Sequence, residues 1–111
     1  MFRLFWADDG GLPANDRGLA YGDGLFETIR MSGQKGVLLS RHLERMARDA
    51  GRLGIEVSRK ELASVCVEAG QRFADRFKGE GWVLKLTLTR GSGGRGYRPD
   101  PGLGPHLRVS A

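Results

Sequence analysis

The sequence predicts an α+β domain in which an antiparallel sheet carries two helices packed on one face. Two observations lead to this fold class. Segments whose apolar residues alternate with polar ones stand near both ends of the chain, and two segments with apolar residues three and four positions apart stand between them. Strands, then helices, then strands is an order typical of α+β domains.

The first predicted strand covers residues 2–6, and the second covers residues 25–31, after a turn rich in glycine and aspartate. In the second strand the odd-numbered residues, among them Glu27, share one face of the sheet. The even-numbered residues, among them Phe26, share the other face. A hairpin loop then leads to a short third strand at 37–39.

Two amphipathic helices are predicted in the middle of the chain. The first begins at Ser40, a good N-cap, and its apolar stripe ends at Gly54. The second begins at Ser58, which forms a capping box with Glu61, so that each side chain accepts a hydrogen bond from the other residue's amide. Gly79 and Gly81 end this second helix.

The last two predicted strands cover residues 82–90 and 106–110, and the loop between them, at 91–104, holds six glycines. The chain ends inside the final strand. We therefore expect residues 1–111 to be the N-terminal small domain of a longer enzyme, cut within its last strand.

Composition restricts the class of protein. With 111 residues, 40% of them hydrophobic and 28% charged, the chain is long and apolar enough for one folded core. No apolar run approaches the ~20 residues of a bilayer crossing. Asp8 and Asp9 interrupt the start, where a secretory signal would be apolar. The single cysteine, Cys66, excludes an internal disulfide and favours the cytoplasm.

The formal charge is +5, from 14 arginines and 4 lysines against 13 acidic residues. This charge permits a small nucleic-acid-binding module, although no zinc-ligand spacing, RNA-binding aromatic pattern or helix-turn-helix signature accompanies it. An oligomerisation domain without chemistry of its own is a third possibility. Both alternatives stand beside an enzyme, which the motifs favour.

Three segments hold the residues that could carry chemistry. Residues 16–30 (DRGLAYGDGLFETIR) place three glycines and two aspartates before the second strand, which on its own is typical of a structural turn. Residues 40–46 (SRHLERM) open the first helix. Residues 90–98 (RGSGGRGYR) place three arginines among four glycines, where guanidinium groups and amides can bind an anion. A plain glycine loop with solvated charges is the alternative for this segment.

In this order the three segments resemble the signature of the class IV (fold type IV) pyridoxal-phosphate enzymes, which include 4-amino-4-deoxychorismate lyases, D-amino-acid aminotransferases and branched-chain aminotransferases. The resemblance implies pyridoxal 5'-phosphate as the cofactor of the whole enzyme, a small substrate with carboxylates, and a homodimer, without nucleic acid or membrane partners. Residues 90–97 resemble the loop typical of the lyases. This implies conversion of 4-amino-4-deoxychorismate to 4-aminobenzoate and pyruvate for folate synthesis, with an aminotransferase as the alternative.

The resemblance places Arg45 on the cofactor phosphate, where a planar guanidinium makes bidentate contacts. The opening turns of a helix also favour an anion through their amides and dipole. The other arginines of this helix are expected on its solvated face. We expect His42 to pack or to support the site, because no partner residues stand at metal-site spacing.

Arg95 and Tyr97 are placed by the same resemblance in a trap for the substrate carboxylate, which in the related aminotransferases reaches into the neighbouring subunit's active site. Phe26 stands where family members have an aromatic residue lining the cofactor pocket, with plain core as the alternative.

The family's chemistry also requires a lysine that binds the cofactor covalently. The resemblance places that lysine in a second domain, beyond residue 111. None of the four lysines here matches it. We therefore expect no catalytic residue in this chain and no lyase activity from the chain alone. We also expect no metal site, because no Cys, His, Asp or Glu partners stand at metal-ligand spacing.

Overall fold

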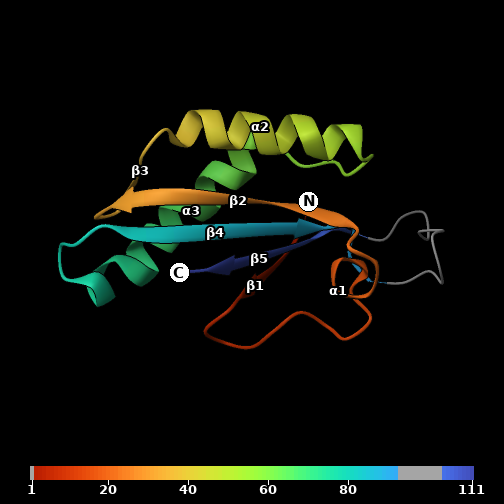
Figure 1. Cartoon of the computed structure of the whole chain (residues 1–111), viewed down its shortest axis with the longest axis horizontal. Helices are drawn as coiled ribbons and strands as arrows, with labels where there is room; N and C mark the ends of the chain where they lie inside the picture. The colour runs from red at the N-terminus through yellow and green to blue at the C-terminus, as the bar shows by residue number, and fades with distance from the viewer. Residues whose placement is uncertain (1, 93–103) are drawn as a thin grey trace.

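The computed structural model describes residues 2–92 and 104–111, and in these ranges a five-stranded sheet carries two long helices (Figure 1). This confirms the predicted α+β class. No helix in these ranges is both long and apolar enough to cross a membrane. In chain order the elements are β1 (Arg3–Trp6), α1 (Arg17–Tyr21), β2 (Gly24–Ser32), β3 (Lys35–Gly36), α2 (Leu39–Arg52), α3 (Arg59–Phe73), the 3₁₀ helix η1 (Ala74–Phe77), β4 (Trp82–Thr89) and β5 (His106–Ser110).

The strand order across the sheet is β1-β5-β4-β2-β3. β4 pairs with β2 and with β5 in the antiparallel sense that the sequence predicted. β1 and β5 run parallel, with Leu4 opposite Leu107, so the sheet is mixed and this part of the prediction was wrong. The reason is that nearly the whole chain joins β1 to β5, and a connection of that length lets two neighbouring strands run in the same direction.

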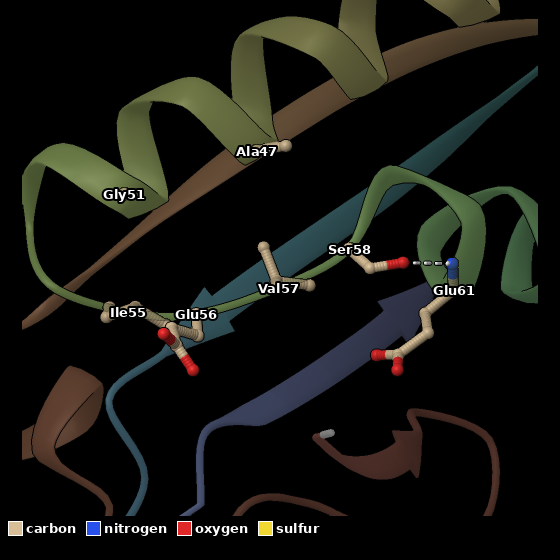
Figure 2. A pocket seen from close by; sticks show the side chains of 7 residues that line it. All are labelled: Ala47, Gly51, Ile55, Glu56, Val57, Ser58 and Glu61. Carbon is tan, nitrogen blue, oxygen red and sulfur yellow. Dashed lines mark hydrogen bonds between the residues drawn. The ribbon is translucent and has the colours of Figure 1, made fainter.

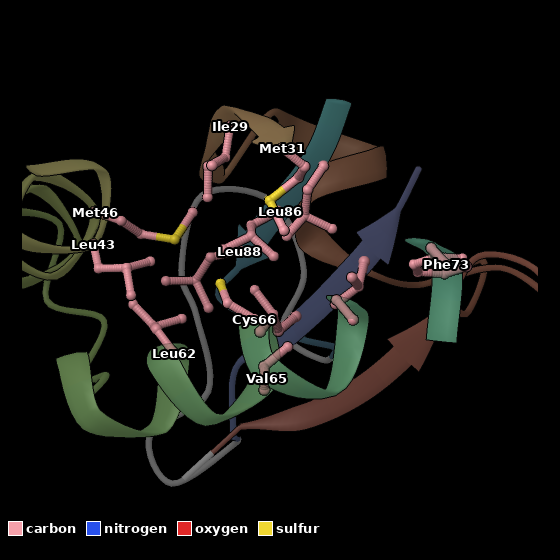
Figure 3. Close-up of a cluster of buried hydrophobic side chains, with 14 of the residues drawn as sticks. Ile29, Met31, Leu43, Met46, Leu62, Val65, Cys66, Phe73, Leu86 and Leu88 are labelled. Atoms are coloured by element: carbon pink, nitrogen blue, oxygen red, sulfur yellow. The ribbon is translucent and has the colours of Figure 1, made fainter. Parts of the chain in front are cut away.

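The core is one layer of apolar side chains between the sheet and the helices α2 and α3 (Figure 3). Alternate residues of β2 and β4 enter it, as predicted. Each large side chain in it contributes roughly 1.5–3 kcal/mol by its burial, which holds the helices over the sheet. The buried apolar residues are Ile29, Met31, Leu43, Met46, Ala50, Ile55, Leu62, Val65, Cys66, Ala69, Phe73, Trp82, Leu84, Leu86, Leu88, Leu107 and Val109.

The start of α2 differs from the prediction. Ser40 is not its N-cap, because the helix begins at Leu39 after Leu38, which has a left-handed backbone (φ 57°, ψ 32°) and makes no side-chain capping bond. The predicted strand at 37–39 is replaced by a two-residue strand at Lys35–Gly36. Leu39 packs against the core, so the gain from apolar packing outweighs the preference for a polar cap.

Ser58 caps α3 as predicted, and its Oγ accepts a hydrogen bond from the amide of Glu61 at 3.1 Å. The return bond of the predicted capping box is not made. Within the described ranges, Oε2 of Glu61 is buried and has no hydrogen-bond partner. α3 ends at Phe73 and passes directly into η1, which is followed by a left-handed residue, Lys78 (φ 48°).

The turn before β2 contains a short helix, α1, that the sequence did not predict. Asp16 is its N-cap and accepts a hydrogen bond from the amide of Leu19 at 3.1 Å. Gly22 ends it in the left-handed region (φ 67°), where a residue without a Cβ meets no steric penalty. Gly18 lies against Thr89 so closely that a Cβ there would overlap the threonine side chain.

Candidate functional site

Arg45, the predicted phosphate ligand, lies in a polar cluster with Glu27 and His42 where α2 packs over β2. Glu27 follows the alternation of β2 onto the helix-covered face and is 6% exposed. Arg45 donates from Nε to Oε2 of Glu27 at 2.9 Å and from Nη2 to Oε1 at 2.6 Å. His42 stands one helical turn before Arg45, and its Nδ1 lies 2.7 Å from Oε1 of Glu27.

The charges of this cluster stabilise each other. Burial raises the pKa of Glu27, but the hydrogen bonds from Arg45 and His42 lower it more, so the pKa lies below its ordinary value. The hydrogen bond to Glu27 raises the pKa of Arg45 above its ordinary value. Glu27 and Arg45 therefore form an ion pair at neutral pH, and its two hydrogen bonds are of the strong, charge-assisted kind.

The outer side of the Arg45 guanidinium is open. The side chain is 56% exposed, and Glu27 occupies only the Nε and Nη2 edge of the guanidinium fork. Within the described ranges, β3 pairs only with Met31 and Ser32, so the part of β2 beside Glu27 has no neighbouring strand on that edge. Exposed guanidinium donors are the groups that bind phosphate esters, so Arg45 fits such a ligand.

The position of Arg45 in α2 contradicts the expectation that the helix amides and dipole help to bind the anion. Arg45 is the seventh residue of the helix, whereas the free amides belong to its first turn and the effect of the helix dipole also falls off within that turn. An anion at Arg45 is therefore bound mainly by the guanidinium, with little contribution from the helix amides.

Phe26 lies on the opposite face of the sheet from this cluster. Its side chain is 60% exposed, and Nζ of Lys85 lies 4.7 Å from the centre of its ring. The alternative that Phe26 is a core residue is therefore wrong. Neighbouring strand residues point to opposite faces, so the structure does not bring the side chain of Phe26 together with Arg45. Its role beside a ligand stays a prediction.

Arg95 and Tyr97 lie outside the described residues, so the predicted trap for a substrate carboxylate stays a prediction. The arginine that begins this segment is described. Arg90 donates from Nε to Oδ2 of Asp23 at 2.8 Å and from Nη2 to the carbonyl oxygen of Leu53 at 2.6 Å. These bonds tie the end of β4 to the turn before β2 and to the end of α2, which gives Arg90 a structural role.

A second buried cluster, which the sequence did not predict, lies around Asp16. This carboxylate is fully buried, and its Oδ1 accepts a hydrogen bond from Oγ1 of Thr89 at 2.5 Å and lies 2.7 Å from Nδ1 of His106. The cluster joins α1 to β4 and β5. Its members stand 73 and 90 residues from Asp16, and no local spacing in a sequence indicates contacts over such separations.

A separate pocket of about 430 Å³ lies between the end of α2 and the start of α3 (Figure 2). Its charged residues are both glutamates, which is the wrong sign for a phosphate. It therefore does not compete with Arg45 as a site for this ligand. The residues that line it are Ala47, Gly51, Ile55, Glu56, Val57, Ser58 and Glu61.

Cys66 is not placed for covalent chemistry. It is buried in the core, and burial raises the pKa of its thiol to about 11, so it is a protonated packing residue. In the described part of the chain, no group of three or more His, Cys, Asp or Glu residues could hold a metal ion. The four lysines stand apart from one another, at Lys35 in β3, Lys60 in α3, Lys78 after η1 and Lys85 in β4.

Residues 24–111 match the family model described as amino-transferase class IV, and this match includes the whole cluster of Glu27, His42 and Arg45. The chain belongs to the class IV aminotransferase family. Enzymes of this family depend on pyridoxal 5'-phosphate, a cofactor that carries a phosphate ester. The exposed guanidinium of Arg45 is a group of the kind that binds such an ester.

Class IV relatives include both lyases and aminotransferases. A 4-amino-4-deoxychorismate lyase from Pseudomonas aeruginosa is 37% identical, with a TM-score of 0.74 over 91% of this chain and 35% of that one. The aminodeoxychorismate lyase of Vibrio harveyi is 32% identical over 96% of this chain and 39% of its own length. The D-alanine aminotransferase of Staphylococcus aureus (strain MSSA476) is 33% identical over 84% of this chain and 33% of its own length.

The chain thus spans 33–39% of the length of these class IV relatives. Its fold matches the N-terminal domain of the fold type IV enzymes. Because the similarity extends to lyases and to aminotransferases alike, it shows the family and not the reaction.

Proposed function

We propose that this chain is the N-terminal domain of a 4-amino-4-deoxychorismate lyase and that Arg45 binds the phosphate of its pyridoxal 5'-phosphate. The whole enzyme converts 4-amino-4-deoxychorismate to 4-aminobenzoate and pyruvate, a step of folate synthesis. The observation that carries this proposal is the Arg45 guanidinium, which a buried carboxylate holds on one edge and which is exposed on the other. In a family that uses a phosphorylated cofactor, such a group fits the phosphate.

Sequence identity supports a lyase over an aminotransferase. The lyase of P. aeruginosa is 37% identical to this chain, whereas the D-alanine aminotransferases of S. aureus and Bacillus licheniformis are 33% and 31% identical. The aminotransferase is the second candidate, because its identity of 33% is close to that of the lyases.

Each candidate residue of the chain has a binding role in this proposal. Arg45 holds the cofactor phosphate, and Arg95 with Tyr97 orients a substrate carboxylate. Phe26 offers its aromatic ring to the ligand from the face of the sheet that α2 and α3 do not cover. The cofactor, when bound, supplies a sink for the electrons that the substrate carbon releases. The covalent lysine, which also moves the proton, is proposed to lie in a second domain. The complete enzyme is proposed to be a cytoplasmic homodimer.

The reaction is tested on the complete protein that carries this chain, loaded with pyridoxal 5'-phosphate. We expect release of 4-aminobenzoate and pyruvate from 4-amino-4-deoxychorismate. We expect no keto acid from D-alanine or branched-chain amino acids when a second keto acid is supplied as the amino-group acceptor. Keto-acid formation without 4-aminobenzoate release would establish the aminotransferase instead.

The isolated 111-residue chain, assayed in parallel, is the control for the missing lysine. We expect it to release no 4-aminobenzoate and to gain no cofactor mass after borohydride reduction. A stable mass increment of one cofactor on this chain would contradict the placement of the lysine in a second domain.

A further inference from the structure

We propose that Glu27 is a positioning residue that fixes the Arg45 guanidinium in the orientation that binds a phosphate. This inference rests on the proposed function, in which Arg45 binds the cofactor phosphate. Glu27 lies within residues 16–30, but the family resemblance assigns it no role in binding. The role follows from the contacts that Glu27 makes in the folded domain.

The two hydrogen bonds between Glu27 and Arg45 determine which edge of the guanidinium is free. Oε2 accepts from Nε at 2.9 Å and Oε1 accepts from Nη2 at 2.6 Å, so the carboxylate lies against the side edge of the planar fork. The donors at the end of the fork, on Nη1 and the outer side of Nη2, are left for another acceptor. A tetrahedral phosphate accepts from two such parallel donors at once.

Glu27 is itself held in place, which makes it an effective support. Its side chain is 6% exposed, in a strand whose partner across the sheet at this position is Leu86 of β4. His42 lies 2.7 Å from Oε1, so the carboxylate is bound by two residues of α2. Arg45 is long, flexible and 56% exposed, and without this support its head group would sample many orientations in water.

The other arginines of α2 for which ion pairs are described lack such a support. Arg48 and Arg52 contact Asp49, a partly exposed residue of the same helix, at 3.2 and 3.5 Å. These are surface contacts, which do little to fix the orientation of an arginine side chain. Among the arginines of α2 with described ion pairs, only Arg45 pairs with a carboxylate in the sheet beneath the helix.

The opposite role for Glu27 would be to compete with the phosphate for Arg45. The side-edge geometry argues against competition, because one guanidinium can bind a carboxylate on its side edge and a phosphate at its end at the same time. The two roles predict effects of opposite sign. Removing the charge of Glu27 weakens phosphate binding if Glu27 positions Arg45, and strengthens it if Glu27 competes.

The test measures dissociation constants of the complete protein for pyridoxal 5'-phosphate and for pyridoxal, which lacks the phosphate. The ratio of the two constants reports the phosphate contact alone, and a general loss of stability does not change it. We expect Arg45→Ala to reduce the preference for the phosphorylated form the most. We expect Glu27→Gln to reduce it about tenfold, since charge-assisted hydrogen bonds support that contact.

The matched control is Glu44→Gln, the same change one residue before Arg45. Glu44 pairs with Arg59, and both side chains are exposed. This variant should keep the wild-type preference. Glu27→Asp keeps the charge but is one methylene shorter, so it cannot reach both donors and should also lose preference. If Glu27→Gln does not fold, the preference of Glu27→Asp for the phosphorylated form tests the positioning role instead.

The outcomes separate the two proposals. If Arg45→Ala leaves the preference unchanged, Arg45 does not bind the phosphate, and the observation that carries the proposed function is overturned. If Arg45→Ala lowers the preference while the Glu27 variants behave like Glu44→Gln, the phosphate contact stands and the positioning role of Glu27 is wrong. A preference that rises in Glu27→Gln shows competition and also overturns it.

Discussion

Asp16 connects three elements of the domain through one carboxylate. It is fully buried and contacts a hydroxyl on β4, an imidazole on β5 and an amide in α1. A buried carboxylate is tolerated only when its oxygens are bound in this way, because its desolvation is otherwise costly. The position of the turn before β2, and with it the start of the strand that carries Glu27, therefore depends on Asp16.

Asp16→Asn should lower the free energy of unfolding by about 3 kcal/mol. The amide group replaces one acceptor oxygen with a donor, so at least one of the buried partners loses its hydrogen bond. Urea unfolding followed by circular dichroism measures the change. Asp75→Asn, at an exposed position in η1, is the control and should change stability by less than about 0.5 kcal/mol. Equal effects of the two variants would contradict the importance of the buried cluster.

Helix α2 and strand β2 are joined by apolar packing and by the bonds of Glu27. Because the pKa of Glu27 is lowered, the stabilisation from its bonds to α2 depends on pH. A group whose pKa is lowered by folding stabilises the protein above the pKa of the unfolded chain, and this stabilisation is lost as the pH falls through the folded-state pKa. The contact between these two elements should therefore weaken in acid.

Glu27→Gln tests this pH dependence. We expect the variant to be less stable than the wild type by about 2 kcal/mol at neutral pH, and the two free energies of unfolding to converge as the pH falls and Glu27 becomes protonated. Urea titrations over a series of pH values measure the difference. Glu44→Gln, with both partners exposed, should show little difference at any pH. A difference for Glu27→Gln that is constant with pH would indicate lost packing instead of lost charge.

How well an element could be predicted depends on whether its cause is local. The faces of β2 and the stripes of both long helices could be predicted, because alternation and helical spacing are local patterns. The start of α2 could not, because Leu39 takes its place through packing against the sheet and not through a cap. Arg45 was found by its motif, but its partner Glu27 lies 18 residues away, and their contact depends on how α2 lies over the sheet.

The sheet as a whole joins the two ends of the chain. β5 lies between β4 and β1, so the last described strand is an interior strand and the first is an edge strand. Leu107 of β5 is fully buried, whereas its partner across the parallel pair, Leu4 of β1, is only partly buried. Local sequence patterns carry no information on this pairing, because it joins residues about as far apart as the chain allows.

This arrangement predicts unequal effects of the same substitution at two paired positions. Leu107→Ala should lower the free energy of unfolding by about 3 kcal/mol, because it removes buried contacts and leaves a cavity in the interior of the sheet. Leu4→Ala should cost about 1 kcal/mol, since water can reach the edge strand and the neighbouring side chains can close the gap. Urea unfolding of both variants measures the difference. An equal or larger loss for Leu4→Ala would contradict a sheet in which β5 is interior and β1 forms its edge.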